Sequence, residues 1–420
     1  MEYSGTPFFM PVLHEFILII LSLQHVNENT HPMKKFKIGL LARIIIAIAL
    51  GIGFGNILSG SLVRVFVTFN GIFSEFLSFI IPLIILGLVT PAIADIGKEA
   101  GKMLVITTLV AYCATLFSGF LSYFTGVTVF PSMITAGAPI EQISEAHDIV
   151  PFFTVAIPPA MNVMTSLILA FTLGLGIAHL ESNALKNVCN DFKEIIVKTI
   201  QAVILPLLPI YIFGIFLNMT HSGQVYSILM VFIKIIGVIF LLHIFLLVFQ
   251  YTIASLFVHR NPLKMLGRMM PAYFTALGTQ SSAATIPVTL RQSIKNGVSE
   301  EIAGFVIPLC ATIHLSGSTL KIVACALALM MMQGMPFDFP MFAGFIFMLG
   351  ITMVAAPGVP GGAIMASLGI LSSMLGFGES EQALMIALYI AMDSFGTACN
   401  VTGDGAIALI IDRLFGKKAS

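Results

Sequence analysis

The chain has 420 residues, of which 58% are hydrophobic and only 10% are charged. A soluble domain carries about a quarter charged residues, so this composition excludes an ordinary soluble enzyme. Twenty basic residues balance twenty acidic ones, which excludes a basic surface wide enough to bind nucleic acid. Hydrophobic stretches of about 20 residues recur along the chain and predict an all-α polytopic membrane protein.

Residues 1–32 differ in pattern from the rest of the chain. Their hydrophobic run, Phe16 to Leu23, is too short to span a bilayer. They also lack the basic start and the small-residue cleavage site of a signal peptide. A basic stretch, Met33 to Lys37, directly precedes the first long hydrophobic run. We therefore expect residues 1–32 to be a dispensable N-terminal extension, or Met33 to be the functional start.

Eight hydrophobic segments then follow that are long enough to cross a membrane: 38–58, 70–94, 103–125, 151–180, 195–219, 225–258, 298–331 and 380–411. Two further segments, near 264–294 and 339–376, are interrupted by Ser, Thr, Gly and Pro. Lys and Arg concentrate at the termini and in every second connection. By the positive-inside rule, this pattern predicts eight transmembrane helices with both termini cytoplasmic, provided that each interrupted segment is a re-entrant hairpin.

The two interrupted segments indicate where a binding site lies. Non-helical backbone persists inside a membrane only where protein or water satisfies its polar groups. Two such breaks are the sequence pattern of a secondary transporter's site. The first spans Gly278 to Pro287 and the second Ala355 to Gly362, and both are rich in residues that form turns. The alternative, ordinary loops between short helices, would disrupt the alternation of charge.

The last predicted span carries a polar stripe. At about 100° per residue, four polar residues fall on one face of a helix: Asp393, Thr397, Asn400 and Asp404. Their carboxylate, amide and hydroxyl oxygens suit a dehydrated Na⁺ or an ammonium group. Residues 400–405 could also unwind locally and offer carbonyls. In the alternative interpretation, the two acids only hold helices together by pairing with Lys321 or Lys234.

A second polar cluster lies in the seventh predicted span. Its members are Thr312, His314, Ser316, Ser318, Thr319 and Lys321. His314 fits either a packing residue or a proton carrier. A lysine about twenty residues into a span must pair, reach the surface or lose its proton, so Lys321 is a functional candidate. Lys234 lies nearer the end of a span and receives no role.

These motifs, in this order, resemble those of the dicarboxylate/amino acid:cation symporter family, which has the glutamate-transporter fold. The matching motifs are the serine-rich break before Thr285 to Thr289, the run from Pro308 to Gly317, the tip from Gly358 to Gly361, and Asp393 to Asp404. The resemblance covers residues 33–415.

The resemblance implies a homotrimer that works by an elevator mechanism in the lipid of the cell membrane (inner or plasma). A static scaffold and trimerisation domain would comprise residues 38–96 and 150–222. A moving transport domain would comprise residues 100–125 and 225–415, including both hairpins.

The resemblance also implies roles for individual residues. Asp393 would bind the substrate's amino group and Asn400 its α-carboxylate, with help from the backbone of the hairpins. The implied substrate-binding residues are Ser281, Ser282, Ser318, Val359, Asp393, Gly396, Thr397 and Asn400. The implied sodium-binding residues are Cys310, Thr312, His314, Met353, Val354, Ala356, Asn400 and Asp404.

Two departures from the family pattern concern the substrate's side chain. Members that carry acidic substrates have an arginine three residues after the aspartate, where this chain has Gly396. The arginine position of the first hairpin is Gln280. A substrate carboxylate would then lie in a low dielectric without a guanidinium partner. We therefore predict a neutral amino acid and a roomier side-chain pocket.

Other departures concern the coupling ions. The aspartate of a further sodium site is replaced by Ser316 and its asparagine by His314, while Val110 and Ala111 stand where hydroxyls of the third span complete that site. A neutral serine does not offset the charge of a buried cation. We therefore predict one or two coupled Na⁺ ions, with a proton carried through His314 or Lys321 as an alternative.

The leading interpretation is a secondary active symporter that imports an amino acid together with Na⁺. The alternative within the same fold is a Na⁺- or H⁺-coupled carrier of dicarboxylates or acidic amino acids. An intramembrane aspartyl protease is disfavoured, because Asp393 and Asp404 lie about 16 Å apart along one helix, too far for a catalytic dyad. A channel is disfavoured because a fixed amine-binding acid between two gates favours occupancy by one molecule at a time.

Overall fold

The computed structural model describes residues 39–98, 102–134, 149–223, 225–356 and 360–416. The predicted N-terminal extension, residues 1–32, and the predicted substrate contact Val359 both lie outside these residues. Regular structure in the described part of the chain is entirely helical, as the sequence predicts.

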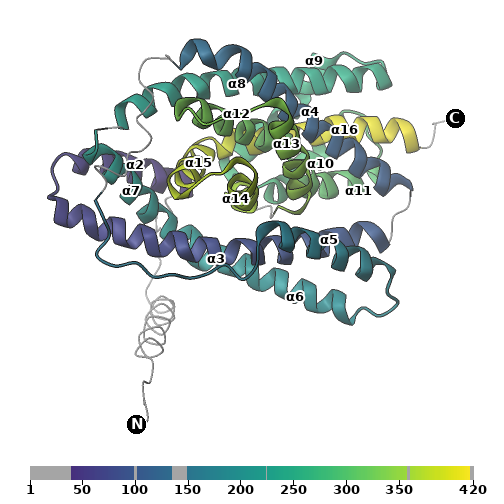
Figure 1. Cartoon of the computed structure of the whole chain (residues 1–420). Coiled ribbons are helices and arrows are strands. Elements are labelled where there is room, and N and C mark those ends of the chain that lie inside the picture. The colour runs from purple at the N-terminus through teal and green to yellow at the C-terminus, as the bar shows by residue number, and fades with distance from the viewer. Residues whose placement is uncertain (1–38, 99–101, 135–148, 224, 357–359, 417–420) are drawn as a thin grey trace, which may run out of the picture. The chain divides into compact units, whose positions relative to one another are not determined.

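The first half of the chain forms helices of different lengths (Figure 1). They are α2 (Leu40–Gly55), α3 (Gly60–Lys98), α4 (Lys102–Met133), α5 (Val163–His179), α6 (Ala184–Thr199), the π-helical η1 (Ile200–Ile204) and α7 (Leu205–His221). Helix α2 packs against α7, and α3 packs against α5, α6 and α7. All of these except α4 belong to the predicted scaffold, whose separation from a transport domain stays a prediction.

The second half consists of one long helix followed by four pairs of shorter helices. They are α8 (Val225–Val258), α9 (Pro262–Thr279), α10 (Ser282–Lys295), α11 (Glu300–Ile313), α12 (Ser316–Met332), α13 (Phe339–Ala355), α14 (Gly362–Leu375), α15 (Glu379–Ala391) and α16 (Asp393–Phe415). Helix α16 packs against α8, α9, α10, α11 and α12 (Figure 1). Its polar stripe therefore faces protein.

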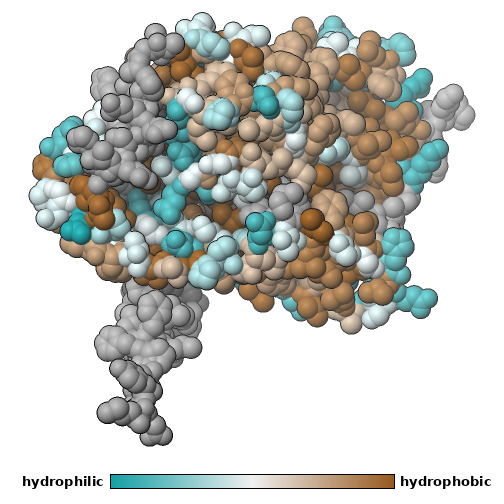
Figure 2. All heavy atoms as spheres, in the orientation of Figure 1, coloured by the Kyte–Doolittle hydropathy of each residue, from teal (hydrophilic) through white to brown (hydrophobic). Residues whose placement is uncertain are grey.

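Six helical stretches in the described residues are long and apolar enough to cross a membrane. Two more of the eight predicted spans, 38–58 and 151–180, form the shorter apolar helices α2 and α5, of 16 and 17 residues. Hydrophobic side chains also cover much of the surface in Figure 2. Ile168 is 64% exposed and Leu241 is 68% exposed, which is typical of helices whose outer face contacts lipid.

Each predicted hairpin is a pair of packed helices, α9 with α10 and α13 with α14. The first pair is separated by Gln280, whose left-handed backbone (φ 53°) turns the chain, and by Ser281, whose side chain caps α10 by accepting from the Ala284 N–H. Gly361 begins α14 with φ 74°, a conformation that only glycine adopts without strain.

The last helix contradicts one expectation. Residues 400–405 are not unwound, because α16 is continuous from Asp393 to Phe415. Its glycines serve close packing instead: a Cβ on Gly403 would lie 2.6 Å from Gln250 Oε1, and one on Gly405 would lie 2.7 Å from the Tyr251 hydroxyl. The helix break falls earlier, at Met392, one residue before Asp393.

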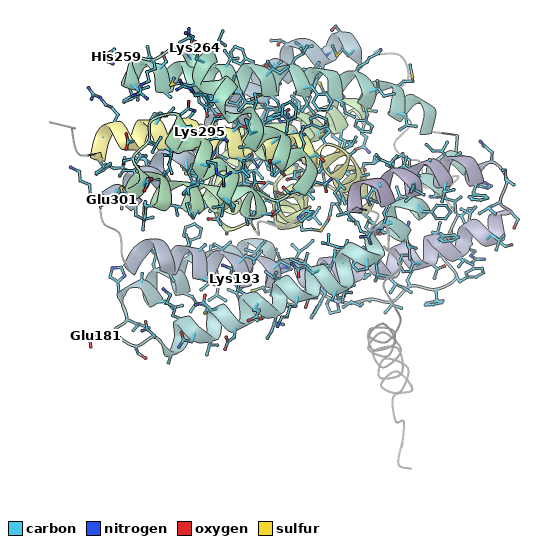
Figure 3. The ribbon with its side chains drawn as sticks, turned by 180° about the vertical axis from the view of Figure 1, so that it is seen from behind. Glu181, Lys193, His259, Lys264, Lys295 and Glu301 are labelled. Carbon is cyan, nitrogen blue, oxygen red and sulfur yellow. The ribbon has the colours of Figure 1, made fainter. Side chains whose placement is uncertain are left out.

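Residues from the connections that are predicted to be cytoplasmic lie in one half of the view in Figure 3. They are Glu181, Lys193, His259, Lys264 and Lys295, and Glu301, from the start of the next predicted span, lies in the same half. The orientation that the positive-inside rule gives for these connections stays a prediction.

Candidate functional site

Four helix breaks meet around one small cavity. Its walls come from the α9–α10, α11–α12, α13–α14 and α15–α16 breaks, and its lining residues are Gln280, Ser282, Ala311, Thr312, Leu315, Ser318, Ala356, Ala363, Tyr389, Asp393, Thr397 and Asn400. The cavity volume is about 20 Å³, roughly enough for one water molecule. An amino acid therefore fits only when the lining segments move apart.

The carboxylate of Asp393 is held at the edge of this cavity by two partners. Its Oδ2 accepts a hydrogen bond from the Gly361 N–H (2.9 Å), and its Oδ1 lies 3.2 Å from Lys321 Nζ. The carboxylate thus joins the starts of α14 and α16 to the middle of α12. The alternative in which a buried acid holds helices together through Lys321 is therefore realised at Asp393.

Lys321 also corrects the expectation of a roomier pocket at Gly396. A Cβ on Gly396 would lie 2.7 Å from Lys321 Nζ and 2.8 Å from Lys321 Cε. The missing side chain therefore makes room for the lysine and leaves no additional cavity. Gly396 is not among the residues that line the cavity, in contrast to Asp393 and Thr397.

Asn400 connects α16 to the start of α12. Its Oδ1 accepts from the N–H groups of Gly317 (2.8 Å) and Ser318 (3.3 Å), and its Nδ2 donates to Ser318 Oγ (3.1 Å). The Tyr389 hydroxyl also donates to Ser318 Oγ (3.0 Å). The predicted substrate residues Ser318, Asp393, Thr397 and Asn400 therefore do come together at the cavity.

The first hairpin contributes both predicted serines, in different ways. Ser282 is buried and lines the cavity, whereas Ser281 caps α10. Next to them, Gln280 Nε2 donates to Ser394 Oγ (3.0 Å). The position at which acidic-substrate members have an arginine thus carries a neutral amide that is bound to α16.

Asp404 forms a second buried acid–base pair. His314 Nδ1 donates to Asp404 Oδ1 (2.8 Å), and Gln250 Nε2 lies 3.4 Å from His314 Nε2 and donates to Ser316 Oγ (3.2 Å). His314, Ser316 and Gln250 thus form one hydrogen-bonded group with Asp404, in which Gln250 Oε1 and Asp404 Oδ2 have no partner in the described residues.

One oxygen of this pair suits a cation. Asp404 Oδ2 is buried and has no hydrogen-bond partner in the described residues. An unpaired carboxylate oxygen at such a position is costly, and Na⁺ prefers oxygen ligands. Asp404 Oδ2 is therefore available as one ligand for a sodium ion.

The remaining predicted sodium ligands lie at the helix ends. The Cys310 carbonyl accepts from the His314 N–H (2.9 Å), and the Met353 carbonyl accepts from the Ala356 N–H (3.2 Å). Thr312 and Ala356 line the cavity, whereas Val354 does not. Both carbonyl groups thus close the last turn of their helices.

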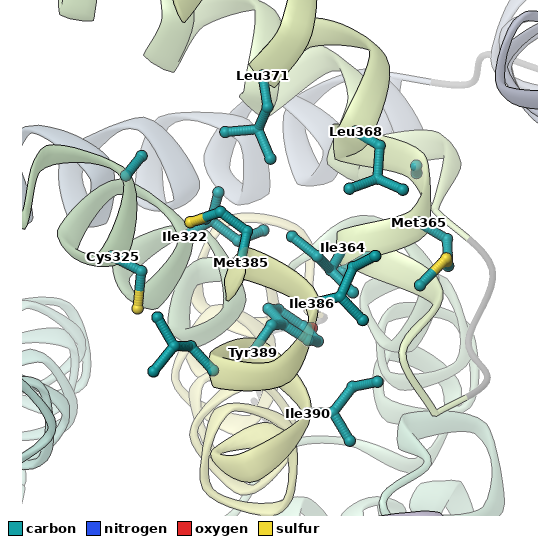
Figure 4. Packing of buried hydrophobic residues seen from close by; sticks show 14 of the residues in the cluster. Ile322, Cys325, Ile364, Met365, Leu368, Leu371, Met385, Ile386, Tyr389 and Ile390 are labelled. Atoms are coloured by element: carbon teal, nitrogen blue, oxygen red, sulfur yellow. The ribbon is translucent and has the colours of Figure 1, made fainter. Parts of the chain in front are cut away.

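Sequence reasoning missed two polar contributors to this site, Gln250 and Tyr389. Gln250 is an amide in the middle of the hydrophobic run 225–258, and that isolation is a signal by which it could have been found. Tyr389 lies on α15, among hydrophobic side chains of α12 and α14 (Figure 4). Nothing in its local sequence distinguishes it from a packing residue.

Comparison with known proteins gives matches to transporters. Residues 40–414 match the model of the sodium:dicarboxylate symporter family. The chain is 28% identical over 306 residues to excitatory amino acid transporter 1 of Bos taurus, covering 69% of this chain and 55% of that protein. It is 29% identical over 163 residues to neutral amino acid transporter B(0) of Rattus norvegicus, covering 38% of this chain and 29% of that protein.

A further relative is excitatory amino acid transporter 4 of Mus musculus, which is 32% identical over 161 residues, or 37% of this chain and 28% of that protein. The chain spans about half the length of the cattle relative. Proteins named for excitatory and for neutral amino acids thus both resemble it.

Proposed function

The chain belongs to the sodium:dicarboxylate symporter family, and from that premise we propose that it is a secondary active symporter that imports a neutral amino acid together with Na⁺. The family has the glutamate-transporter fold and its members are transporters, not enzymes, so both of those predictions are confirmed. One observation carries the proposal: a buried carboxylate, Asp393, lies at a cavity whose lining also offers amide and hydroxyl groups.

This combination suits the two charged ends of an amino acid. A buried carboxylate binds an ammonium group strongly, because the pairing offsets the cost of burying either charge. The Asn400 amide and the Gly317 and Ser318 N–H groups now bond to one another and to Ser318 Oγ, and they would donate to a substrate carboxylate by exchanging those bonds. A zwitterion that bridges Asp393 and α12 would use both.

A neutral side chain is favoured by the residues at the two arginine positions. Gln280 is bound to Ser394, and Gly396 bears no side chain. Neither supplies a guanidinium group for a carboxylate in a low dielectric. The proposed substrate therefore has an uncharged side chain.

Coupling to one or two Na⁺ ions is proposed because two kinds of oxygen ligand are present, a carboxylate oxygen and backbone carbonyl oxygens. Asp404 Oδ2 would bind one ion, and carbonyl groups near Met353, Val354 and Ala356 would bind a second when the hairpin closes. At the position of the third site, the Ser316 hydroxyl has no negative charge that would offset a cation. Its Oγ instead accepts a hydrogen bond from Gln250 Nε2. An N–H donor at that position opposes a cation.

The proposal extends to assembly and movement. The chain would form homotrimers in the cell membrane with both termini cytoplasmic. The scaffold would comprise residues 38–96 and 150–222, and the transport domain, 100–125 and 225–415, would move as an elevator. Purified protein that elutes as a monomer in mild detergent and in native lipid would contradict the trimer.

The decisive experiment is counterflow of labelled amino acids in proteoliposomes. We expect uptake of at least one neutral amino acid only when Na⁺ is present, with the candidate identified first by a thermal-shift screen of the twenty amino acids. Strong uptake of aspartate that neutral amino acids fail to inhibit would contradict the neutral substrate. Flux that persists without any internal substrate and never saturates would indicate a channel.

A second candidate, an acidic amino acid or a dicarboxylate, is favoured by one observation. Lys321 Nζ lies beside Gly396, close to where the side chain of the family's arginine begins. In this alternative, Lys321 would bind the side-chain carboxylate, and His314 could carry a proton in place of Na⁺. Measuring reversal potentials while varying Na⁺ and pH separately distinguishes these coupling ions.

A further inference from the structure

Lys321 has the surroundings of a charged ammonium group. It is fully buried, with 0% of its surface exposed. Its Nζ lies 3.2 Å from Asp393 Oδ1, and it donates to the carbonyls of Met392 (3.3 Å) and Tyr389 (3.4 Å). The same nitrogen lies 3.5 Å from the centre of the Tyr389 ring. Three acceptors and an aromatic face match the three N–H donors and the positive charge of an ammonium.

Asp393 separates this ammonium group from the cavity. Asp393 and Tyr389 line the cavity, whereas Lys321 does not. Both carboxylate oxygens already have partners, Lys321 on Oδ1 and the Gly361 N–H on Oδ2. A substrate ammonium that reaches Asp393 from the cavity therefore meets a carboxylate whose charge is already neutralised.

Gly396 and Lys321 form a matched pair. Any side chain at position 396 would collide with the lysine, because even a Cβ would lie 2.7 Å from Nζ. Hydrophobic side chains of α12, α14 and α15 pack around Tyr389 and exclude water from this region (Figure 4). The lysine is thus held beside Asp393 by the packing around it and cannot reach solvent.

We propose, on the basis of the amino-acid symport argued above, that Lys321 is a tethered ammonium group that competes with the substrate's amino group for Asp393. When the site is empty, Lys321 neutralises Asp393. When substrate binds, its ammonium takes over part of that carboxylate and the lysine bond lengthens. The empty site therefore carries no unpaired buried carboxylate, and the unloaded transport domain can return through the membrane without another cation at Asp393.

The competition predicts opposite effects on binding and on net transport. Lys321→Met removes the competitor and keeps a side chain of similar length, so we expect amino-acid affinity to rise by about tenfold. Net uptake requires the empty carrier to return with an unpaired Asp393, so we expect it to fall by about tenfold or more. Exchange of labelled for unlabelled amino acid requires only the loaded carrier and should persist.

The experiment compares net uptake and exchange in the same proteoliposomes. Lys234→Met, at an exposed lysine of α8, is the matched control and should leave the ratio of net uptake to exchange unchanged. Lys321→Ala gives a second test, since propylammonium fits the space vacated by the lysine. We expect propylammonium to restore net uptake, and 1-propanol, of similar size but uncharged, to have no effect.

The outcomes distinguish a failure of the tethered ammonium from a failure of the proposed amino-acid symport. Wild-type protein without Na⁺-dependent exchange of any amino acid would overturn both. Active wild-type protein whose Lys321→Met variant loses net uptake and exchange equally, or binds amino acid more weakly, would overturn the tethered ammonium alone. If Lys321→Met weakens binding of acidic substrates only, the lysine binds a side-chain carboxylate and the competition is wrong.

Discussion

Helix α16 carries two buried acids in different electrostatic states. Asp393 has both oxygens occupied, one by the Lys321 ammonium and one by a backbone N–H. Asp404 has one oxygen bound to the His314 imidazole and the other without a partner in the described residues. The difference teaches that two buried carboxylates on one helix can have different kinds of partner: a lysine side chain of the protein contacts the first, whereas the second keeps one oxygen open that a mobile ion could bind.

The largest effect is expected from a substitution that breaks the pair of Asp393 and Lys321. Asp393→Asn removes the carboxylate and leaves the Lys321 ammonium unpaired, so we expect amino-acid binding to be lost and stability to fall by about 3–5 kcal/mol. Isothermal titration and thermal unfolding measure the two effects. Asp338→Asn is the matched control, because Asp338 caps α13 on the exposed surface and asparagine caps equally well.

Adding Lys321→Met to Asp393→Asn sharpens this test. The double variant no longer buries a lone charge, so we expect its melting temperature to recover while amino-acid binding stays absent. Recovery of both properties would show that Asp393 does not bind the substrate's amino group.

Asp404→Asn breaks the second pair and should act on sodium. Wild-type protein should become more thermostable as Na⁺ concentration rises, because an ion that binds only the folded state stabilises it. The variant should lose most of that rise while its stability without Na⁺ changes little. Asp412→Asn is a control on the same helix, where Asp412 accepts from Ser299 at the chain surface; an equal loss there would refute the assignment.

Two substitutions together, at Gly396 and Lys321, should shift the substrate preference toward acidic amino acids. Gly396→Arg alone places a guanidinium against Lys321, so we expect substrate binding to fall about tenfold or more from collision and like-charge repulsion. Combined with Lys321→Met, the arginine gains space, and competition by aspartate should increase relative to neutral amino acids. Competition assays with labelled substrate measure both; a double variant that still ignores aspartate would contradict the role of this position.

The smallest effect is expected from a change at Gln250, whose amide contacts His314, the partner of Asp404. Gln250→Leu removes a donor to Ser316 and a contact to His314, and loss of such bonds costs about 1 kcal/mol. We expect the apparent affinity for Na⁺ to fall about fivefold with no change in substrate preference. Thr252→Val, at an exposed hydroxyl on the same helix, should leave Na⁺ affinity unchanged.

The helical periodicity of the last span was sufficient to predict which side chains gather at the site. Asp393, Thr397, Asn400 and Asp404 lie on one buried stripe, as the 3.6-residue repeat requires. The hairpins also follow from local sequence, because Gly361 and the Gln280–Ser281 turn interrupt helices that hydrophobic runs would otherwise continue.

Pairing between distant segments was not predictable in the same way. Periodicity places Lys321 inside a helix but does not say that its ammonium reaches Asp393, 72 residues later. The absence of a side chain at Gly396 suggested empty space, whereas a neighbouring helix fills it. Glycines at 403 and 405 suggested unwinding, yet they allow α8 and α9 side chains to pack closely against an intact helix.

The four helix breaks also determine the electrostatic potential around the cavity. At each break one helix ends and the next begins, and the two helix ends act as partial charges of about half an electron of opposite sign. The ends of α11 and α13 therefore present negative potential, and the beginnings of α12 and α14 present positive potential, around one small space. The helix dipoles thus favour cations at one side of the cavity and carboxylates at another. The backbone, as well as the side chains, would therefore orient a zwitterion that enters.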